Sequence, residues 1–174
     1  LNPYIKDVAR RAAKAGFLAF APDALHPLGG YPGNDDKGRS MQRSMERSKI
    51  EKDFIAAARF LSAQPGIEKI GAVGFCFGGY IVNMLSAQEG NIIQAGVPYY
   101  GTPASETLWG NIEAPLMVQL AENDKRVNAT WPKYEAALKQ QGSDYQMFMY
   151  SECQHGFHND STGRYNEIAA ELSW

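Results

Sequence analysis

One of the two cysteines lies in a glycine-rich segment, residues 74–79, with the sequence GFCFGG. A short apolar run at 70–73 precedes it, and a helical pattern follows. Glycines around a cysteine between a buried strand and a helix are typical of a nucleophile elbow, a tight turn that lifts a reactive side chain above the sheet. The backbone N–H groups after the turn point to the same place. We therefore expect Phe77 to supply an oxyanion donor and the positive helix end to favour the thiolate of Cys76.

A cysteine nucleophile needs a base and a carboxylate that orients the base. Groups that face a ligand lie at the carboxyl ends of strands, so both partners should follow strands that come later in the chain. Asp124 follows the apolar run 116–120, and His155 follows the run 145–150. The sequence therefore predicts that Cys76, Asp124 and His155 converge as a catalytic triad.

Each of these residues also has a simpler interpretation. Cys76 can be a buried structural cysteine, Asp124 a turn or helix-cap residue, and His155 an ordinary loop histidine. Glu122 is a competing carboxylate and His158 a competing base. Three such residues at the right strand ends and in the right chain order favour the triad over three separate coincidences.

Two cofactor interpretations are weaker than the triad. The glycines of the elbow have spacings that a nucleotide-binding turn also uses: Gly71, Gly74 and Gly78. Phe75 and Phe77 are bulky where a phosphate would approach, and no acidic residue ends a following strand to hold a ribose. A metal cluster can be drawn from four residues near the C-terminus: Cys153, His155, His158 and Asp160. Their spacing fits no closed zinc pattern, so we expect neither a metal nor a cofactor.

Elements that alternate between strand and helix must position these residues. Apolar runs predict strands at 17–20, 70–73, 92–99, 116–120 and 145–150. Apolar residues at helical spacing predict helices at 5–12, 40–63, 78–87, 129–141 and 164–174, and turn formers predict a long loop from 21 to about 38. Parallel strands need crossover helices, so the pattern specifies an α/β fold, a mostly parallel sheet with helices on both faces.

Composition narrows the function classes. The chain has 174 residues, 44% of them hydrophobic and 21% charged, which fits one globular domain and does not indicate disorder. A net charge of −2 points to no nucleic-acid partner. No apolar stretch approaches the roughly 20 residues of a membrane span, and no leader is evident, so a cytoplasmic monomer or homodimer is expected, with both cysteines as thiols.

At these motifs the chain resembles the dienelactone hydrolase family of α/β-hydrolases, in particular the carboxymethylenebutenolidase-like proteins. The matching pieces are Ala21-Pro22-Asp23, the GFCFGG elbow, the Asp124 segment ending in Arg126-Val127, and Gln154-His155-Gly156-Phe157. The resemblance covers essentially residues 1–174. It implies attack of the cysteine on an ester or lactone carbonyl, an acyl-thioester intermediate, and hydrolysis by water activated at His155.

Compared with the family that it resembles, this sequence departs from the pattern in two respects. The family's first strands, its second oxyanion donor and an acidic residue that manages the resting cysteine fall before Leu1, so a single domain that is incomplete at its N-terminus is expected. The alternative is therefore that the chain is a non-catalytic or degenerate fragment, whose function is to bind a ligand. A flavodoxin-like redox or nucleotide-binding module is a third.

The second departure concerns the substrate. The dienelactone enzymes carry an arginine four residues after the histidine, where this chain has Asn159, so the substrate is expected not to be dienelactone itself. Arg164 could swing toward the pocket, and Tyr100, at the end of a predicted strand, could line it or serve as packing. One helix face carries arginines every four residues, either as a solvated stripe or as an anion-attracting rim: Arg39, Arg43 and Arg47.

Overall fold

The computed structural model describes residues 1–88 and 90–174. The chain forms two compact units, residues 1–61 and 62–174, each with its own set of internal contacts. All residues of the predicted triad belong to the second unit. No helix in the described part of the chain is long and apolar enough to cross a membrane.

The first unit consists of helices and loops: α1 (Pro3–Lys14), η1 (His26–Leu28), α2 (Asp35–Ser44) and α3 (Arg47–Ser62). Helix α1 begins at Pro3, two residues before the helix predicted at 5–12, and its first turn is capped. The Asn2 side chain accepts a hydrogen bond from the backbone N–H of Ile5, and Pro3 occupies the first helical position, where no N–H is needed.

The strand predicted at 17–20 is absent, and this prediction was wrong. The segment has an irregular backbone, and no strand pairs with it among the described residues. Phe17 is 70% exposed and Leu18 is 64% exposed. An apolar run indicates a tendency toward burial, whereas a strand also needs a neighbouring strand to satisfy its backbone N–H and C=O groups.

The long helix predicted at 40–63 is two helices. Helix α2 begins at Asp35, inside the predicted loop, because the Asn34 side chain caps it by accepting from the N–H of Lys37. It ends at Ser44, because the backbone of the next residue, Met45, is extended, with ψ of 146°. No proline or glycine signals this break in the sequence.

The break in the helix corrects the predicted arginine stripe. Arg39 and Arg43 belong to α2, whereas Arg47 begins α3, so the three do not share one helix face. Arg39 also forms an ion pair with Asp36 at 3.1 Å.

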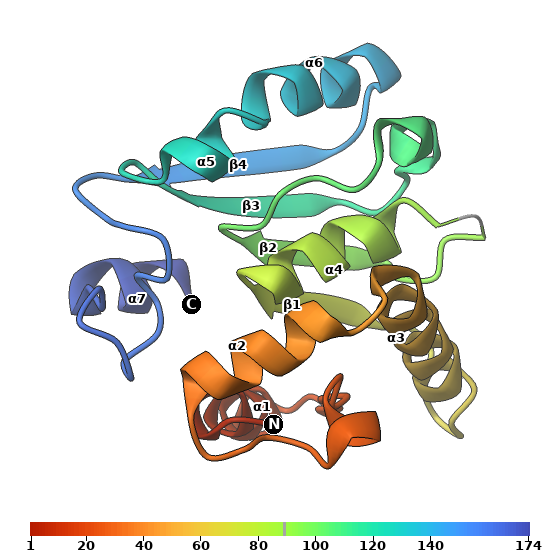
Figure 1. Cartoon of the computed structure of the whole chain (residues 1–174). Helices are drawn as coiled ribbons and strands as arrows, with labels where there is room; N and C mark the ends of the chain where they lie inside the picture. Colours follow the sequence, from red (N-terminus) through yellow and green to blue (C-terminus); the bar gives the residue numbers. More distant parts are fainter. Residues whose placement is uncertain (89) are drawn as a thin grey trace. The chain divides into compact units, whose positions relative to one another are not determined.

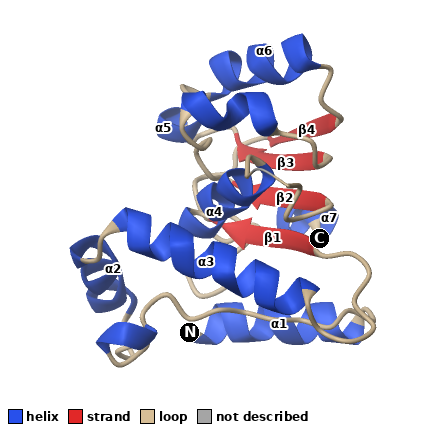
Figure 2. Ribbon diagram, turned by 90° about the vertical axis from the view of Figure 1, so that its right-hand side faces the viewer, coloured by secondary structure: helices blue, strands red, loops and turns tan. Residues whose placement is uncertain are grey.

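The second unit contains a parallel sheet and its crossover helices. Its elements are β1 (Gly71–Phe75), α4 (Phe77–Ser86), β2 (Ala95–Tyr99), η2 (Glu106–Asn111), β3 (Leu116–Ala121), α5 (Lys125–Asn128), α6 (Trp131–Gln141), β4 (Tyr145–Tyr150) and α7 (Glu167–Ser173). The strands pair in parallel in the order β1-β2-β3-β4, as Figures 1 and 2 show. The predicted α/β fold is confirmed. The helix predicted at 129–141 is preceded by a separate turn of helix, α5.

Helices cover both faces of this sheet, as Gly96 and Tyr99 of β2 show. A side chain at Gly96 would collide with Val82 of α4 and with Leu116, so α4 packs on this face and requires a glycine there. Tyr99 is three residues further on and therefore points to the opposite face. Its hydroxyl donates to the backbone carbonyl of Ser173 in α7.

An aromatic cluster packs α6 against η2. Tyr134 of α6 is 2% exposed, and its ring lies 5.3 Å from that of Trp109 and 6.0 Å from that of Trp131, centroid to centroid. Its hydroxyl donates to the side chain of Asn83 in α4. A buried tyrosine of this kind contributes through its apolar area and its satisfied hydroxyl.

Candidate active site

Cys76 occupies a strained turn between β1 and α4. Its φ of 57° and ψ of −111° are rarely adopted by a residue with a side chain. Two contacts hold the turn. The backbone N–H of Cys76 donates to the Tyr99 carbonyl at 3.0 Å, and the Cα of Gly74 is so close to the Gly78 carbonyl that no side chain fits between them. The turn leaves Cys76 exposed at the end of the strand.

Asp124 caps α5 and reaches His155 with its second oxygen. Its Oδ1 accepts from the backbone N–H of Val127 at 3.2 Å, which fixes the carboxylate at the start of the helix. Its Oδ2 lies 2.5 Å from Nδ1 of His155. The Asp124 side chain is only 5% exposed, so little water competes for these bonds.

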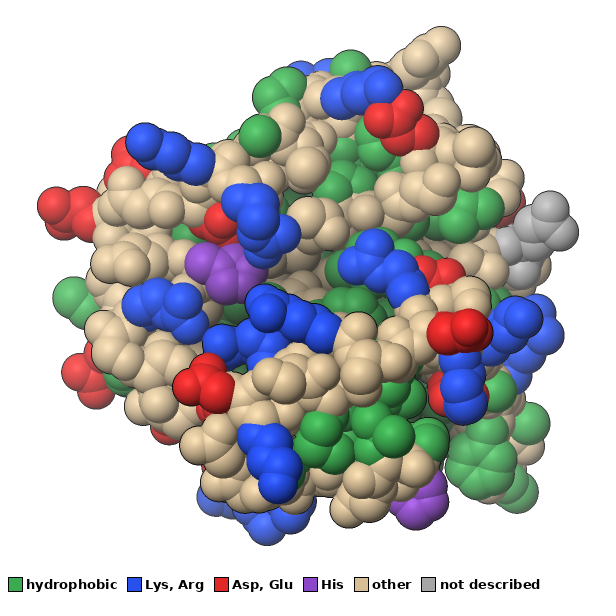
Figure 3. Space-filling model, viewed as in Figure 1, with side chains coloured by type: hydrophobic (Ala, Val, Ile, Leu, Met, Phe, Trp, Pro, Cys, Tyr) green, Lys and Arg blue, Asp and Glu red, His purple; other side chains and the backbone are tan. Residues whose placement is uncertain are grey.

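His155 links this carboxylate to the cysteine. Its Nε2 lies 2.9 Å from Sγ of Cys76, so the imidazole stands between the other two side chains with one nitrogen toward each. The His155 side chain is 23% exposed. Figure 3 shows histidine side chains, in purple, at the surface of the molecule. The structure thus brings together the three residues that the sequence placed at strand ends.

The surroundings of Cys76 favour its charged form. Desolvation by the surrounding protein raises the pKa of the Cys76 thiol, but the hydrogen bond and charge of His155, the backbone N–H of Phe77 and the charge of Arg126 together lower it below its ordinary value. Desolvation lowers the pKa of His155, whereas its contacts with Cys76 and Asp124 raise it overall. Opposite shifts of this kind favour a thiolate–imidazolium pair.

The family model described as "Dienelactone hydrolase family" matches residues 2–174. The chain belongs to the dienelactone hydrolase family. The predicted family membership is therefore confirmed.

Individual relatives are similar over different shares of their length. A stretch of 46 residues is 67% identical to the "Putative hydrolase fragment YghX" of Escherichia coli K12, covering 26% of this chain and 39% of that protein. The whole chain aligns at 28% identity with the "Putative carboxymethylenebutenolidase" of a Synechocystis species, over 78% of that protein. Among solved structures, the dienelactone hydrolase-like promiscuous phosphotriesterase P91 from metagenomic libraries superposes over the whole chain, with a TM-score of 0.81, 25% identity and 77% of its own chain covered.

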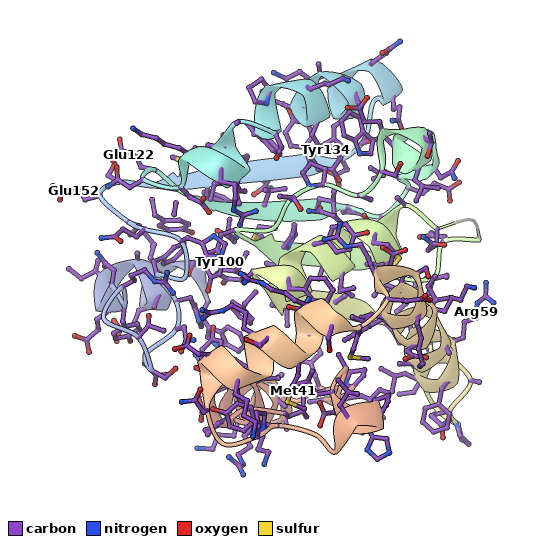
Figure 4. The ribbon with its side chains drawn as sticks, viewed as in Figure 1. Met41, Arg59, Tyr100, Glu122, Tyr134 and Glu152 are labelled. Carbon is purple, nitrogen blue, oxygen red and sulfur yellow. The ribbon has the colours of Figure 1, made fainter. Side chains whose placement is uncertain are left out.

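Within this dienelactone hydrolase family member, the rival acid and base lie outside the triad. The Glu122 carboxylate accepts from the backbone N–H of Glu152 at 2.7 Å, and the two residues lie together beyond the ends of β3 and β4 (Figure 4). His158 is 2% exposed, and its ring packs 4.9 Å from Phe75 and 5.1 Å from Tyr99, centroid to centroid. The neighbours of His158 are thus mainly aromatic rings of the core.

Phe77 is the first residue of α4, and its backbone N–H bonds to the Cys76 sulfur. Its oxyanion role stays a prediction.

The three residues predicted to contact substrate have different surroundings. Tyr100 is 1% exposed, and its ring lies 5.1 Å from that of His155, centroid to centroid. The Asn159 side chain accepts from the backbone and hydroxyl of Ser161, within its own turn. Arg164 is exposed, and its guanidinium lies over Gly156, next to the histidine. Their roles toward substrate stay predictions.

Sequence reasoning missed two groups that act on Cys76. Arg126 lowers the thiol pKa by its charge, and the Tyr99 carbonyl holds the Cys76 N–H. A signal existed for Arg126, because it lies two residues after Asp124 at the same strand end. In residues 1–88 and 90–174, no group of three or more side chains has the arrangement of a metal site.

The two cysteines should differ sharply in reactivity. Both are free thiols, but Cys153 is buried, and desolvation together with the charges of Glu122 and Glu152 raises its pKa. Because alkylation requires the thiolate, iodoacetamide should modify Cys76 at pH 6 to 7, where Cys153 stays protonated. Peptide mass spectrometry over a pH series gives both rates. Equal rates across pH 6 to 8 would exclude an activated Cys76.

Proposed function

We propose that this chain carries the catalytic site of an ester or lactone hydrolase that uses Cys76 as its nucleophile. The observation that carries the proposal is the continuous hydrogen-bonded series from Asp124 through His155 to the Cys76 sulfur, with separations of 2.5 and 2.9 Å. A base between a nucleophile and an orienting carboxylate is the arrangement that nucleophilic acyl transfer needs.

The first half of the reaction forms an acyl-thioester. The Cys76 thiolate attacks the substrate carbonyl carbon, and the carbonyl electron pair moves to oxygen as an oxyanion beside the Phe77 N–H. The oxyanion then collapses and breaks the bond to the alkoxide, which takes a proton from the His155 imidazolium. Asp124 holds Nδ1 protonated, so that Nε2 faces the reacting atoms.

The second half of the reaction releases the acid. Neutral His155 takes a proton from a water molecule as that water attacks the thioester carbonyl. The second oxyanion collapses, the carbon–sulfur bond breaks, and Cys76 leaves as a thiolate beside the newly formed imidazolium. In a lactone the leaving alkoxide stays tethered to the acyl group, so the product is one hydroxy acid.

Names of relatives and the local chemistry support a small ester or lactone as substrate. The Synechocystis relative is named a carboxymethylenebutenolidase, and P91 is described as dienelactone hydrolase-like. The Asn159 side chain is neutral and already bonded within its turn, so it offers no charge to a substrate carboxylate. We therefore propose a neutral ester or lactone in preference to an anionic one.

A chromogenic short-chain ester tests the proposal. The chain should hydrolyse p-nitrophenyl acetate, and Cys76→Ala should lower kcat by about 10³-fold or more. Cys153→Ala is the matched control and should retain activity. Mass spectrometry of quenched reactions should find an acyl group on Cys76.

Two results would contradict the proposed function. One is full hydrolysis by the Cys76→Ala protein, which would place the chemistry elsewhere. The other is no hydrolysis by the unmodified chain although Cys76 is alkylated rapidly, which would favour the alternative of a ligand-binding module.

A further inference from the structure

Tyr100 is buried directly beside the triad, in an unusual backbone conformation. Its φ is 37°, and its side chain is 1% exposed. The ring of His155 lies 5.1 Å away at a tilt of 59°, and on another side Phe157 packs edge-on against Tyr100 at 5.4 Å. Figure 4 shows Tyr100 at the ends of the strands. One imidazole and several aromatic rings therefore surround a residue whose conformation costs free energy.

The backbone around Tyr100 is fixed to the cysteine turn. The N–H of Tyr100 donates to the Gln119 carbonyl of β3 at 2.7 Å, and the preceding carbonyl, of Tyr99, accepts from Cys76. Immediately after it, Gly101 presses against Gly79 of α4, so closely that a side chain on either glycine would collide with the backbone of the other. The position of the Tyr100 ring is thus tied to the position of the nucleophile.

His155 needs such a neighbour because its two hydrogen bonds do not fix its plane. They hold Nδ1 and Nε2, but the imidazole can still tilt about the line through these atoms, since it is carried by a loop after β4. Tilting would misdirect the nitrogen lone pair and the N–H, which must lie near the ring plane. The Tyr100 ring, packed 5.1 Å from the imidazole centroid at a tilt of 59°, opposes this motion.

We propose that Tyr100 is a positioning residue, whose ring holds the His155 imidazole in the plane that serves both Cys76 and Asp124. This inference rests on the proposed function for its catalytic consequence, but the ring geometry itself can be measured without any substrate. The hydroxyl is not required by this role, and the aromatic ring is.

Three variants separate positioning from general stability. Tyr100→Leu should lower kcat for the neutral ester by about 10- to 100-fold with little change in KM, because a misaligned base costs rate after the substrate has bound. Tyr100→Phe keeps the ring and should restore most of the activity. Tyr134→Leu removes a tyrosine that is equally buried but lies in the α6 cluster, and it should destabilise the fold without this loss of kcat.

The pH profile of Cys76 alkylation gives a readout independent of hydrolysis. Tyr100→Leu should shift its midpoint to higher pH, since a misaligned imidazolium stabilises the thiolate less. The charged groups that act on the pair are retained in every variant: Asp124, Arg126 and His155 itself. An unchanged midpoint and kcat in Tyr100→Leu, or an equal shift in Tyr134→Leu, would overturn the inference.

Magnetic resonance on the unmodified chain tests the inference even if a variant does not fold. Protons of the Tyr100 and His155 rings should show a nuclear Overhauser effect, and its absence would overturn the inference. If the chain hydrolyses no ester but the ring contact and the shifted midpoint are found, the proposed function fails and the positioning role stands.

Discussion

Replacing His155 by glutamine is expected to lower kcat/KM for ester hydrolysis by about 10³-fold or more. Glutamine keeps a polar group of similar length, but it cannot accept and return a proton. It also removes the imidazolium that lies 2.9 Å from the Cys76 sulfur and helps to lower the thiol pKa. The variant therefore loses both the base and much of the thiolate.

Steady-state kinetics with a neutral p-nitrophenyl ester measures the loss of kcat/KM. The pH profile of Cys76 alkylation measures how much of that loss comes from the smaller thiolate fraction. Because the stabilising charge is gone, the alkylation midpoint should rise toward that of an ordinary thiol. His26→Gln, at an exposed histidine outside the triad, is the control and should leave both measurements unchanged. A His155→Gln protein that retains a tenth of the activity would exclude His155 as the base.

Replacing Gly74 by alanine is expected to destabilise the fold by about 3 kcal/mol or more, a large effect for the addition of a single methyl group. Its Cβ would overlap the carbonyl group of Gly78, which is backbone and cannot rotate away. Gly78 is the matched control, because a Cβ there has nothing within 4 Å. Alanine at Gly78 should change stability by no more than about 1 kcal/mol, since alanine suits a helix better than glycine.

Urea denaturation of the two variants, compared at equal m-value, measures the difference. The sequence motif G-x-C-x-G gives no reason to distinguish the two glycines. In the structure only Gly74 of the two lacks room for a side chain. Equal losses in both variants would contradict the asymmetry and indicate that the elbow relaxes around an added methyl group.

The triad could be predicted because it depends on connectivity. In a parallel sheet the carboxyl ends of all strands lie at the same edge, so the loops after β1, β3 and β4 leave the sheet on the same side and can bring their residues together. Cys76, Asp124 and His155 meet for this reason. Connectivity also predicted the α/β fold with helices on both faces, because parallel strands need crossover helices.

Other features depend on contacts that no local pattern records. The apolar run at 17–20 has the composition of a strand, yet strand formation is decided by a neighbour far along the chain. The break between α2 and α3 has no proline or glycine to mark it. The packing of Tyr100 against His155 joins residues that are far apart in sequence, and neither residue type implies the other.

Asp124 uses its two oxygens for two different donors, and this explains why a carboxylate suits the position better than an amide. Oδ1 accepts from the Val127 N–H, and Oδ2 accepts from the His155 ring. An asparagine has one oxygen for these two donors, so its amide N–H₂ would face either the helix start or the imidazole N–H and repel it. Local helix formation and base orientation would then compete for a single acceptor. The carboxylate avoids this conflict, because its two ends are chemically equivalent.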